Sequence, residues 1–277
     1  MNEAIITIQK HDAHPSDAQR WGRARERAVL RGRMICDLLS PEVNFSEAVA
    51  LDAGCGYGGT SIALCERGAD VIAVDRDPAR LGELSATCPS LEIEHADIAS
   101  LPYPDKSFHL IILQDVIEHV TDALGVLREM HRVLCDDGLL YMSTPNRDSV
   151  LNLVADPHFG LPFAATKKRA ELRTLLRAKR PSEAERDDLA ELFSLAAFSD
   201  ALQHSGFSFR FINTRVAKAL FEQPDALVWS TWHVRAVAFL RRSGMYRAAL
   251  GMVNDEPGFF NRRINPTWYL LCRKLPS

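Results

Sequence analysis

The chain has 277 residues and a formal net charge of −3 at pH 7, from 33 Lys and Arg against 36 Asp and Glu. Hydrophobic residues make up 47% and charged residues 25%, which is typical of a globular protein and excludes disordered and collagen-like classes. The nearly balanced charge provides no overall field that would recruit nucleic acid or an anionic membrane. We therefore expect neither partner, and the length predicts one large domain or a core with insertions.

Targeting and redox signals point to the cytoplasm. The N-terminus lacks the basic start and apolar segment of a secretory signal. The longest apolar stretch, residues 227–240, is interrupted by His233 and Arg235 and falls short of the ~20 residues that span a membrane. The six cysteines are scattered without a CxxC pair, as expected for reduced thiols. We expect a cytoplasmic protein without stable membrane insertion, and no metal, because its His and acidic residues form no compact ligand set in the sequence.

The first half of the chain is expected to form a leader and helix over residues 1–44, followed by an alternating α/β core. Residues 21–39 place apolar side chains at helical spacing, with the arginines on the other face. The expected strands are 48–54, 70–77, 91–97, 108–115 and 138–146, and the helices between them begin at Thr60, Pro78 and Asp122. Strands and helices in alternation predict parallel crossover units and a three-layer α/β sandwich.

The second half is less regular. Its expected elements are an irregular loop over 147–165, helices over 166–180, 183–192 and 193–205, a strand over 207–214, a helical region over 218–250 and a last strand over 267–274. We find no internal repeat. The sequence therefore predicts a single domain over residues 45–277, with helical insertions at about 147–193 and 215–262 that form a lid.

A glycine-rich turn follows the first expected strand, at Gly54, Gly56, Gly58 and Gly59. Such a turn lets the backbone approach a ligand closely at a helix N-terminus. The spacing fits the G-x-G-x-x-G of dinucleotide-binding proteins as well as G-x-G-x-G, and an ordinary strand-to-helix turn is also possible. Asp52 favours another ligand, because a carboxylate there would repel a pyrophosphate and suits an ammonium group. The ligand implied is a nucleoside joined to an amino acid.

Two more aspartates end expected strands. Asp75 can accept hydrogen bonds from both hydroxyls of a ribose, although it could instead cap the helix at Pro78, a role for which Asp77 is equally placed. Asp97 can accept the exocyclic amine of an adenine, or it could be a solvated turn residue. The three strand ends together predict a nucleoside site at the carboxyl edge of the sheet.

Five segments in this order resemble class I S-adenosylmethionine-dependent methyltransferases, and the small-molecule group similar to ubiquinone-biosynthesis O-methyltransferases is nearest. They are D52-A-G-C-G-Y-G, V-I-A-V-D75, H-A-D97-I-A-S-L-P-Y-P-D-K-S-F-H-L-I-I, Q114-D-V-I-E-H119-V and G138-L-L-Y-M-S-T-P-N146. The resemblance covers about residues 45–146 and, more loosely, 193–214 and 267–274. It implies a Rossmann-like, seven-stranded, mostly parallel sheet whose last strand is antiparallel, and S-adenosyl-L-methionine as the cofactor.

The resemblance also implies roles for particular residues. Gly54 and Gly56 would line the methionine portion, Asp52 would lie near its ammonium and Gln114 would contact the amino-acid part. Arg76 departs from the small apolar residue often found after the ribose-binding acid, and would stack beside the adenine or point to solvent. The implied cofactor-binding set is Asp52, Gly54, Cys55, Gly56, Asp75, Arg76, Asp97, Ile98 and Gln114.

Two histidines are the candidate catalytic residues for an acceptor hydroxyl. His119 follows the fourth strand, near the expected methyl position, and could also be a helix-start residue bonded to backbone. His158 lies in the loop after the fifth strand and could be a base, an acceptor contact or a turn residue. The basic segment 166–180 could steer an anionic molecule, or it could be a helix face paired with the acidic run 183–191.

The sequence therefore predicts an enzyme that transfers a methyl group from S-adenosylmethionine to a small and possibly anionic molecule, with oxygen the favoured acceptor atom and in-line displacement as the mechanism. A nicotinamide-dependent oxidoreductase of Rossmann type would share the glycine turn and Asp75, but it would not account for Asp52 or Asp97. A non-catalytic S-adenosylmethionine-binding subunit is the third alternative.

Overall fold

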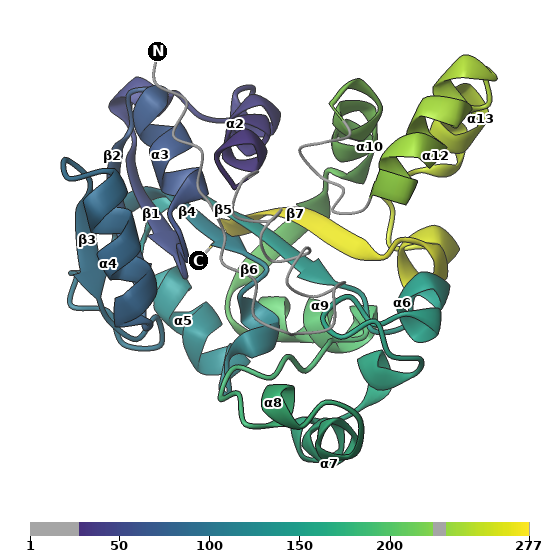
Figure 1. The fold of residues 1–277 in the computed structure, drawn as a ribbon. Coiled ribbons are helices and arrows are strands. Elements are labelled where there is room, and N and C mark those ends of the chain that lie inside the picture. Colours follow the sequence, from purple (N-terminus) through teal and green to yellow (C-terminus); the bar gives the residue numbers. More distant parts are fainter. Residues whose placement is uncertain (1–27, 224–230, 277) are drawn as a thin grey trace.

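The computed structural model describes residues 28–223 and 231–276. Its centre is a seven-stranded sheet in the order β3-β2-β1-β4-β5-β7-β6 (Figure 1). β7 runs antiparallel to β5 and β6, and the other neighbouring strands are parallel. The strands are β1 Val49–Ala53, β2 Asp70–Asp75, β3 Glu92–His95, β4 Phe108–Gln114, β5 Leu134–Pro145, β6 Phe207–Phe211 and β7 Thr267–Lys274. The predicted α/β fold with an antiparallel last strand is confirmed.

The central strands are apolar on both faces because helices cover both sides of the sheet. In β4, Leu110 and Ile112 face one buried cluster, and Ile111 and Leu113 face the other. Each of these four side chains is fully buried. A continuous apolar run is the pattern expected of a strand in the middle of a parallel sheet.

Helices form the two outer layers (Figure 1). The helices of the first layer are α2 Ala28–Leu39, α3 Gly59–Glu66, α4 Pro78–Thr87 and α10 Asn213–Glu222, and their apolar sides pack in one cluster. The second layer contains α5 Ala123–Val133 and α9 Leu195–His204, which share the other cluster. Residues 21–27 of the predicted first helix lie outside the described residues. The strand order reverses between β1 and β4, and in such sheets ligands bind beyond the carboxyl ends of the strands at that point.

The first insertion differs from its prediction in two places. Residues 147–165 were expected to be irregular, but they contain the short helix α6 Val150–Val154. Residues 183–192 were expected to be helical, but α8 ends at Ala184 and a segment of turns and irregular backbone follows. The remaining elements are η3 Ala164–Thr166, α7 Arg169–Lys179 and α8 Pro181–Ala184. A separate small core under α7 and α8, which includes Leu172 and Leu176, holds this insertion together.

The second insertion and the remaining short turns complete the described chain. The helices are α12 Thr231–Arg242 and α13 Tyr246–Met252, and the short turns are η1 Phe45–Glu47, η2 Ile117–His119 and the π-helical η4 Phe260–Ile264. α12 and α13 lie beside α10, on the side away from α2 (Figure 1). Within the described ranges, no helix combines the length and the apolar character needed to cross a bilayer.

Candidate functional site

Three glycines of the turn after β1 have left-handed backbone, with φ of +77° at Gly54, +57° at Gly56 and +72° at Gly58. A Cβ at Gly54 would lie 2.6 Å from a methyl group of Val116, and one at Gly58 would lie 2.2 Å from a methyl group of Leu84. A Cβ at Gly56 would meet nothing within 4 Å. Gly54 and Gly58 are therefore needed for packing, whereas Gly56 borders open space that a ligand can use.

This difference predicts distinct effects of alanine substitutions. Gly58→Ala is expected to lower the free energy of unfolding by about 2–5 kcal/mol, because left-handed backbone costs ~1–2 kcal/mol and overpacking against Leu84 costs ~1–3 kcal/mol. Gly56→Ala is expected to lose only ~1–2 kcal/mol of stability, yet to weaken ligand binding. Gly82→Ala, in α4 where a Cβ meets nothing within 4 Å, serves as the control. Urea unfolding checks the stabilities, and a Gly58→Ala protein as stable as Gly82→Ala would contradict the packing argument.

Asp75 connects the glycine turn to the start of α4. Its Oδ2 accepts a hydrogen bond from the backbone N–H of Gly56 at 2.8 Å, and its Oδ1 accepts one from that of Asp77 at 2.9 Å. The cap of α4 is Asp77, whose Oδ1 accepts from the Ala79 N–H at 2.9 Å. Asp75 therefore does not serve as the helix cap, and it holds a carboxylate beside the open space at Gly56.

Asp52 is almost completely buried within β1, with 3% of its surface exposed. Its Oδ2 accepts a hydrogen bond from Ser61 Oγ at 2.5 Å. Burial raises the pKa of Asp52 to about 6, an effect that the Ser61 hydrogen bond offsets only in part and that the nearby Asp75 carboxylate reinforces. The ionised form is thus costly in this structure, and a neighbouring cation would reduce that cost.

The other predicted cofactor residues differ in exposure. Asp97 is exposed, and its Oδ1 accepts a hydrogen bond from the Ala99 N–H at 2.9 Å, as in a local turn. Ile98 is 7% exposed and packs in the core, so only a small part of it can reach a ligand. Arg76 is exposed. Cys55 is half-buried next to the glycines, and burial raises the pKa of its thiol, so it is not a reactive thiolate.

A polar cluster surrounds Gln114 at the end of β4. The Gln114 amide is assigned the orientation that satisfies its hydrogen bonds. In this orientation its oxygen accepts from Arg31 Nε at 2.5 Å and its nitrogen donates to Thr60 Oγ1 at 3.0 Å. Arg31 also forms an ion pair with Asp115, which in turn accepts a hydrogen bond from Ser143 Oγ at 2.7 Å. Asp115 has a φ of +53°, and such strained non-glycine residues are concentrated at functional sites.

The two candidate histidines lie together, although 39 residues separate them in the chain. The rings of His119 and His158 meet edge to face with centroids 5.0 Å apart. Glu118, His119 and His158 each offer a ligand atom, and these atoms lie within 4.8 Å of one another. The expectation that the His and acidic residues form no compact ligand set is therefore wrong, because it was judged from sequence spacing and folding brings a distant loop to this point.

Burial changes the pKa values of this cluster. It lowers the pKa of His119, whose Nδ1 lies 2.6 Å from the backbone oxygen of Asp188. It raises the pKa of the fully buried Glu118 to about 8, and the nearby Asp115 carboxylate adds to the effect. Glu118 Oε2 accepts a hydrogen bond from Thr144 Oγ1 at 2.9 Å. Burial therefore disfavours the charged forms of both Glu118 and His119.

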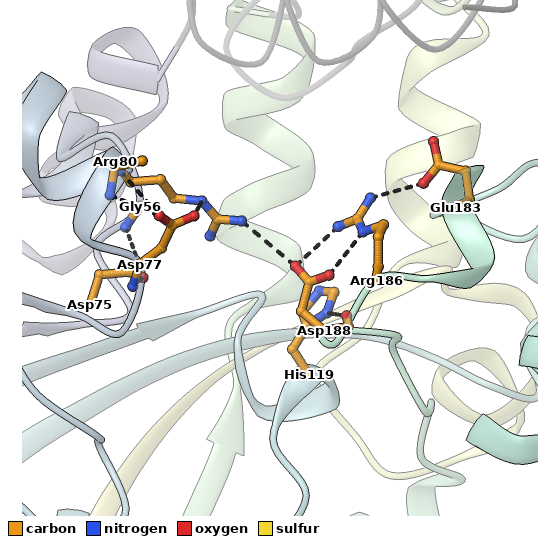
Figure 2. A network of polar contacts seen from close by, with 9 residues as sticks. Gly56, Asp75, Asp77, Arg80, His119, Glu183, Arg186 and Asp188 are labelled. Atoms are coloured by element: carbon orange, nitrogen blue, oxygen red, sulfur yellow. Dashed lines mark hydrogen bonds and ion pairs between the residues drawn. The ribbon is translucent and has the colours of Figure 1, made fainter.

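Residues 185–192 connect the insertion to both parts of the site. Asp188 accepts two hydrogen bonds from Arg186, at 2.8 and 3.0 Å, and its Oδ2 lies 3.6 Å from Arg80 Nη2 (Figure 2). Arg80 also pairs with Asp77, at 3.1 Å. Because the backbone of Asp188 contacts His119 at the same time, this segment spans from the first turn of α4 to the histidine pair.

The basic face of residues 166–180 pairs with the segment that follows it. Arg173 donates to the backbone oxygens of Ala184 and Arg186 at 3.1 and 2.9 Å, and Lys168 forms an ion pair with Glu191 at 2.8 Å. These contacts agree with the interpretation of a helix face paired with the 183–191 run.

A half-open cavity of about 270 Å³ lies next to this segment, and Val120, the residue directly after His119, is part of its lining. Three cationic side chains and one carboxylate are among its lining residues. They are Val120, Thr121, Ala123, Arg147, Lys168, Arg169, Glu191, Leu192, Phe193, Ser194 and Ala197.

Sequence reasoning missed three of the residues that build this site. Arg31 was expected on the exposed face of its helix, but it lies four residues before the buried Ile35, a spacing that places both on one helix face. The sequence signal for Glu118 was weaker: it is an acidic residue directly beside an apolar residue, Ile117, that is buried in the structure. No local pattern distinguishes Asp188, because its role comes from the path of the insertion.

The comparisons with known proteins agree with this geometry. Residues 51–142 match the sequence model of a methyltransferase domain family. A protein of Mycobacterium tuberculosis named "Probable S-adenosylmethionine-dependent methyltransferase" is 37% identical over 117 residues, which is 42% of each chain. A ubiquinone biosynthesis O-methyltransferase of Ruegeria pomeroyi is 33% identical over 114 residues, 40% of this chain and 46% of that protein.

The chain thus spans less than half the length of both relatives. The crystal structure of an S-adenosylmethionine-dependent methyltransferase from Mesorhizobium loti has the same fold, with a TM-score of 0.54, 18% identity, and coverage of 86% of this chain and 96% of that one. The chain therefore resembles a methyltransferase domain family over residues 51–142 and shares the fold of an S-adenosylmethionine-dependent methyltransferase.

Proposed function

We propose that the protein is an enzyme that transfers the methyl group of S-adenosylmethionine to an oxygen atom of a small molecule. The observation that carries the proposal is the open space at Gly56, bordered by the Asp75 carboxylate within the segment that matches the methyltransferase family. The hydroxyls of a nucleoside ribose can donate hydrogen bonds to Asp75. The positively charged ammonium group of the cofactor would reduce the free-energy cost of ionising the buried Asp52. The scattered cysteines support action in the cytoplasm.

Methyl transfer requires mainly that the protein align the acceptor oxygen with the methyl group of the cofactor. An acceptor oxygen attacks the methyl carbon in line with the S–CH3 bond, so that an O–CH3 bond forms as the S–CH3 bond breaks and neutral S-adenosylhomocysteine leaves. A hydroxyl acceptor also gives up its proton. Holding the reacting atoms ~3–3.5 Å apart supplies much of the rate enhancement. We assign contact with the acceptor to His119 and His158, which lie beyond the carboxyl ends of β4 and β5.

An anionic small molecule is the acceptor class that we favour. The cavity of about 270 Å³ next to His119 is lined by three cationic side chains, Arg147, Lys168 and Arg169, and by one carboxylate, that of Glu191. The overall charge of −3 and the small volume of this cavity argue against nucleic acid as the acceptor.

Turnover tests this proposal against a non-catalytic role. The chain is incubated with S-adenosylmethionine and a panel of small hydroxy acids, phenols and carboxylates, and release of S-adenosylhomocysteine is measured by mass spectrometry. We expect release with at least one acceptor, and a loss of ~10²–10⁴-fold in His158→Asn, because loss of assistance to proton removal from the acceptor hydroxyl costs that much. His204→Asn, at an exposed histidine of α9, serves as the control. Binding of the cofactor with no turnover on any acceptor would contradict the proposal in favour of a binding subunit.

A further inference from the structure

We propose that Glu118, His119 and His158 form a binding site for a divalent transition-metal ion, with Zn²⁺ as the best fit. Two imidazoles and one carboxylate are borderline ligands that suit Zn²⁺ and its first-row neighbours, whereas Mg²⁺ and Ca²⁺ prefer oxygen ligands. The three ligand atoms lie within 4.8 Å of one another. Tetrahedral ligation at ~2.1 Å requires separations of about 3.4 Å, so the donors must close by roughly 1.4 Å at most.

Glu118 supplies the observation that points to a ligand. The residue is fully buried in the middle of η2, and its Oε1 has no hydrogen-bond partner among the described residues. Its other oxygen, Oε2, accepts from Thr144 Oγ1 at 2.9 Å, which fixes the direction of the carboxylate. Buried polar atoms are nearly always satisfied in folded proteins, so an atom of this kind calls for a partner that the described part of the chain does not supply.

The histidines are arranged as metal ligands usually are. His119 Nδ1 lies 2.6 Å from the backbone oxygen of Asp188. A donated Nδ1–H at this position leaves the lone pair on Nε2, and metal-bound histidines are commonly fixed in this way by a backbone carbonyl. The loop that carries His158 is held by Asp156, whose Oδ1 accepts from the backbone N–H groups of His158 and Phe159 at 3.0 and 2.7 Å. Both imidazoles keep partial exposure, which leaves a path of entry.

Three protein ligands leave the fourth position of a tetrahedral ion open, as in catalytic zinc sites. On the basis of the proposed function, an oxygen of the acceptor would occupy that position. An ion held there would make the acceptor hydroxyl more acidic, so that its proton would pass to water as its oxygen attacks the methyl carbon. In this arrangement the imidazoles hold the ion, and neither serves as the base.

Metal titration without cofactor tests the site independently of methyl transfer. The full chain is stripped with EDTA, titrated with Zn²⁺ by calorimetry, and titrated with Co²⁺ while its visible absorption is recorded. We expect one ion per chain. Glu118→Gln and His158→Asn should each lose at least ~100-fold in Zn²⁺ affinity, because loss of a residue that only hydrogen-bonds to a metal ligand already costs 10–100-fold. His204→Asn, at the exposed last residue of α9, should bind as wild type does.

The controls separate a lost ligand from a lost fold. Glu118→Gln keeps an oxygen that can accept from Thr144, and each variant is first checked for the thermal shift that S-adenosylhomocysteine produces in the wild type. Absence of Zn²⁺ binding in the wild type would overturn the proposal. Equal Zn²⁺ affinity in the wild type, Glu118→Gln and His158→Asn would also overturn it, because the ion would then bind elsewhere. Failure of the wild type to bind S-adenosylhomocysteine would instead count against the proposed function.

Discussion

Replacing Asp75 with alanine is expected to weaken S-adenosylmethionine binding by at least about 100-fold. In the proposed complex, this carboxylate accepts hydrogen bonds from both ribose hydroxyls, and each hydrogen bond to a charged group contributes ~1.5–3 kcal/mol. A total of about 3 kcal/mol corresponds to roughly two orders of magnitude in affinity. The variant also removes the acceptor for the Gly56 N–H, so the turn that borders the ligand loses its support. Calorimetric titration with S-adenosylhomocysteine measures the loss.

Asp70 offers a matched control, because it is an exposed aspartate at the opposite end of the same strand. Asp70→Ala should bind the cofactor product as the wild type does. Asp75→Asn keeps one acceptor oxygen and should fall between the wild type and Asp75→Ala. An Asp75→Ala protein that is folded by circular dichroism and binds with unchanged affinity would rule out Asp75 as the ribose ligand.

The second large effect concerns stability and pH at Asp52. Its pKa of about 6 in the folded chain exceeds the ordinary value of 3.8, because burial disfavours the charged form. The folded state therefore binds the proton more tightly than the unfolded state does. This contribution to stability is complete below about pH 4 and is lost as the pH rises through about 6. The difference between pKa values of 3.8 and about 6 corresponds to about 3 kcal/mol in the free energy of unfolding.

Asp52→Asn removes this titration. The stability of the variant relative to the wild type should therefore rise by up to about 3 kcal/mol between pH 4 and pH 7, whatever constant cost the amide itself adds. Urea unfolding at several pH values measures this difference. Asp70→Asn, at an exposed residue, should show no comparable trend. A pH-independent difference between Asp52→Asn and the wild type would show that Asp52 is not held at a raised pKa.

The sequence predicted the sheet well because each strand has a local signature. β7 occupies residues 267–274 as predicted, and β4 ends within one residue of its predicted end. The glycine turn was predictable for the same reason, since positive φ restricts the residues that can stand there. In contrast, residues 185–192 were predicted to be helical from composition alone. Their path is set by contacts of Asp188 with Arg80 and His119, and these contacts have no local signature.

The candidate site was predictable only in part, because its residues come from distant segments. Strand ends can be located in a sequence, so Asp52, Asp75 and Gln114 could be proposed in advance. The pairing of Arg31 with Asp115 joins a helix to a strand end 84 residues away. Likewise, His119 and His158 were separate candidates, and only the fold shows that they share one cluster with Glu118.

The most direct test of the account is calorimetric titration of the purified full chain with S-adenosylhomocysteine and, separately, with NADH. We expect saturable heat with the thioether nucleoside, lost in Asp75→Ala, and none with the dinucleotide, whose pyrophosphate would face the Asp52 carboxylate. Heat with NADH and none with either S-adenosylmethionine or its demethylated product would contradict this expectation.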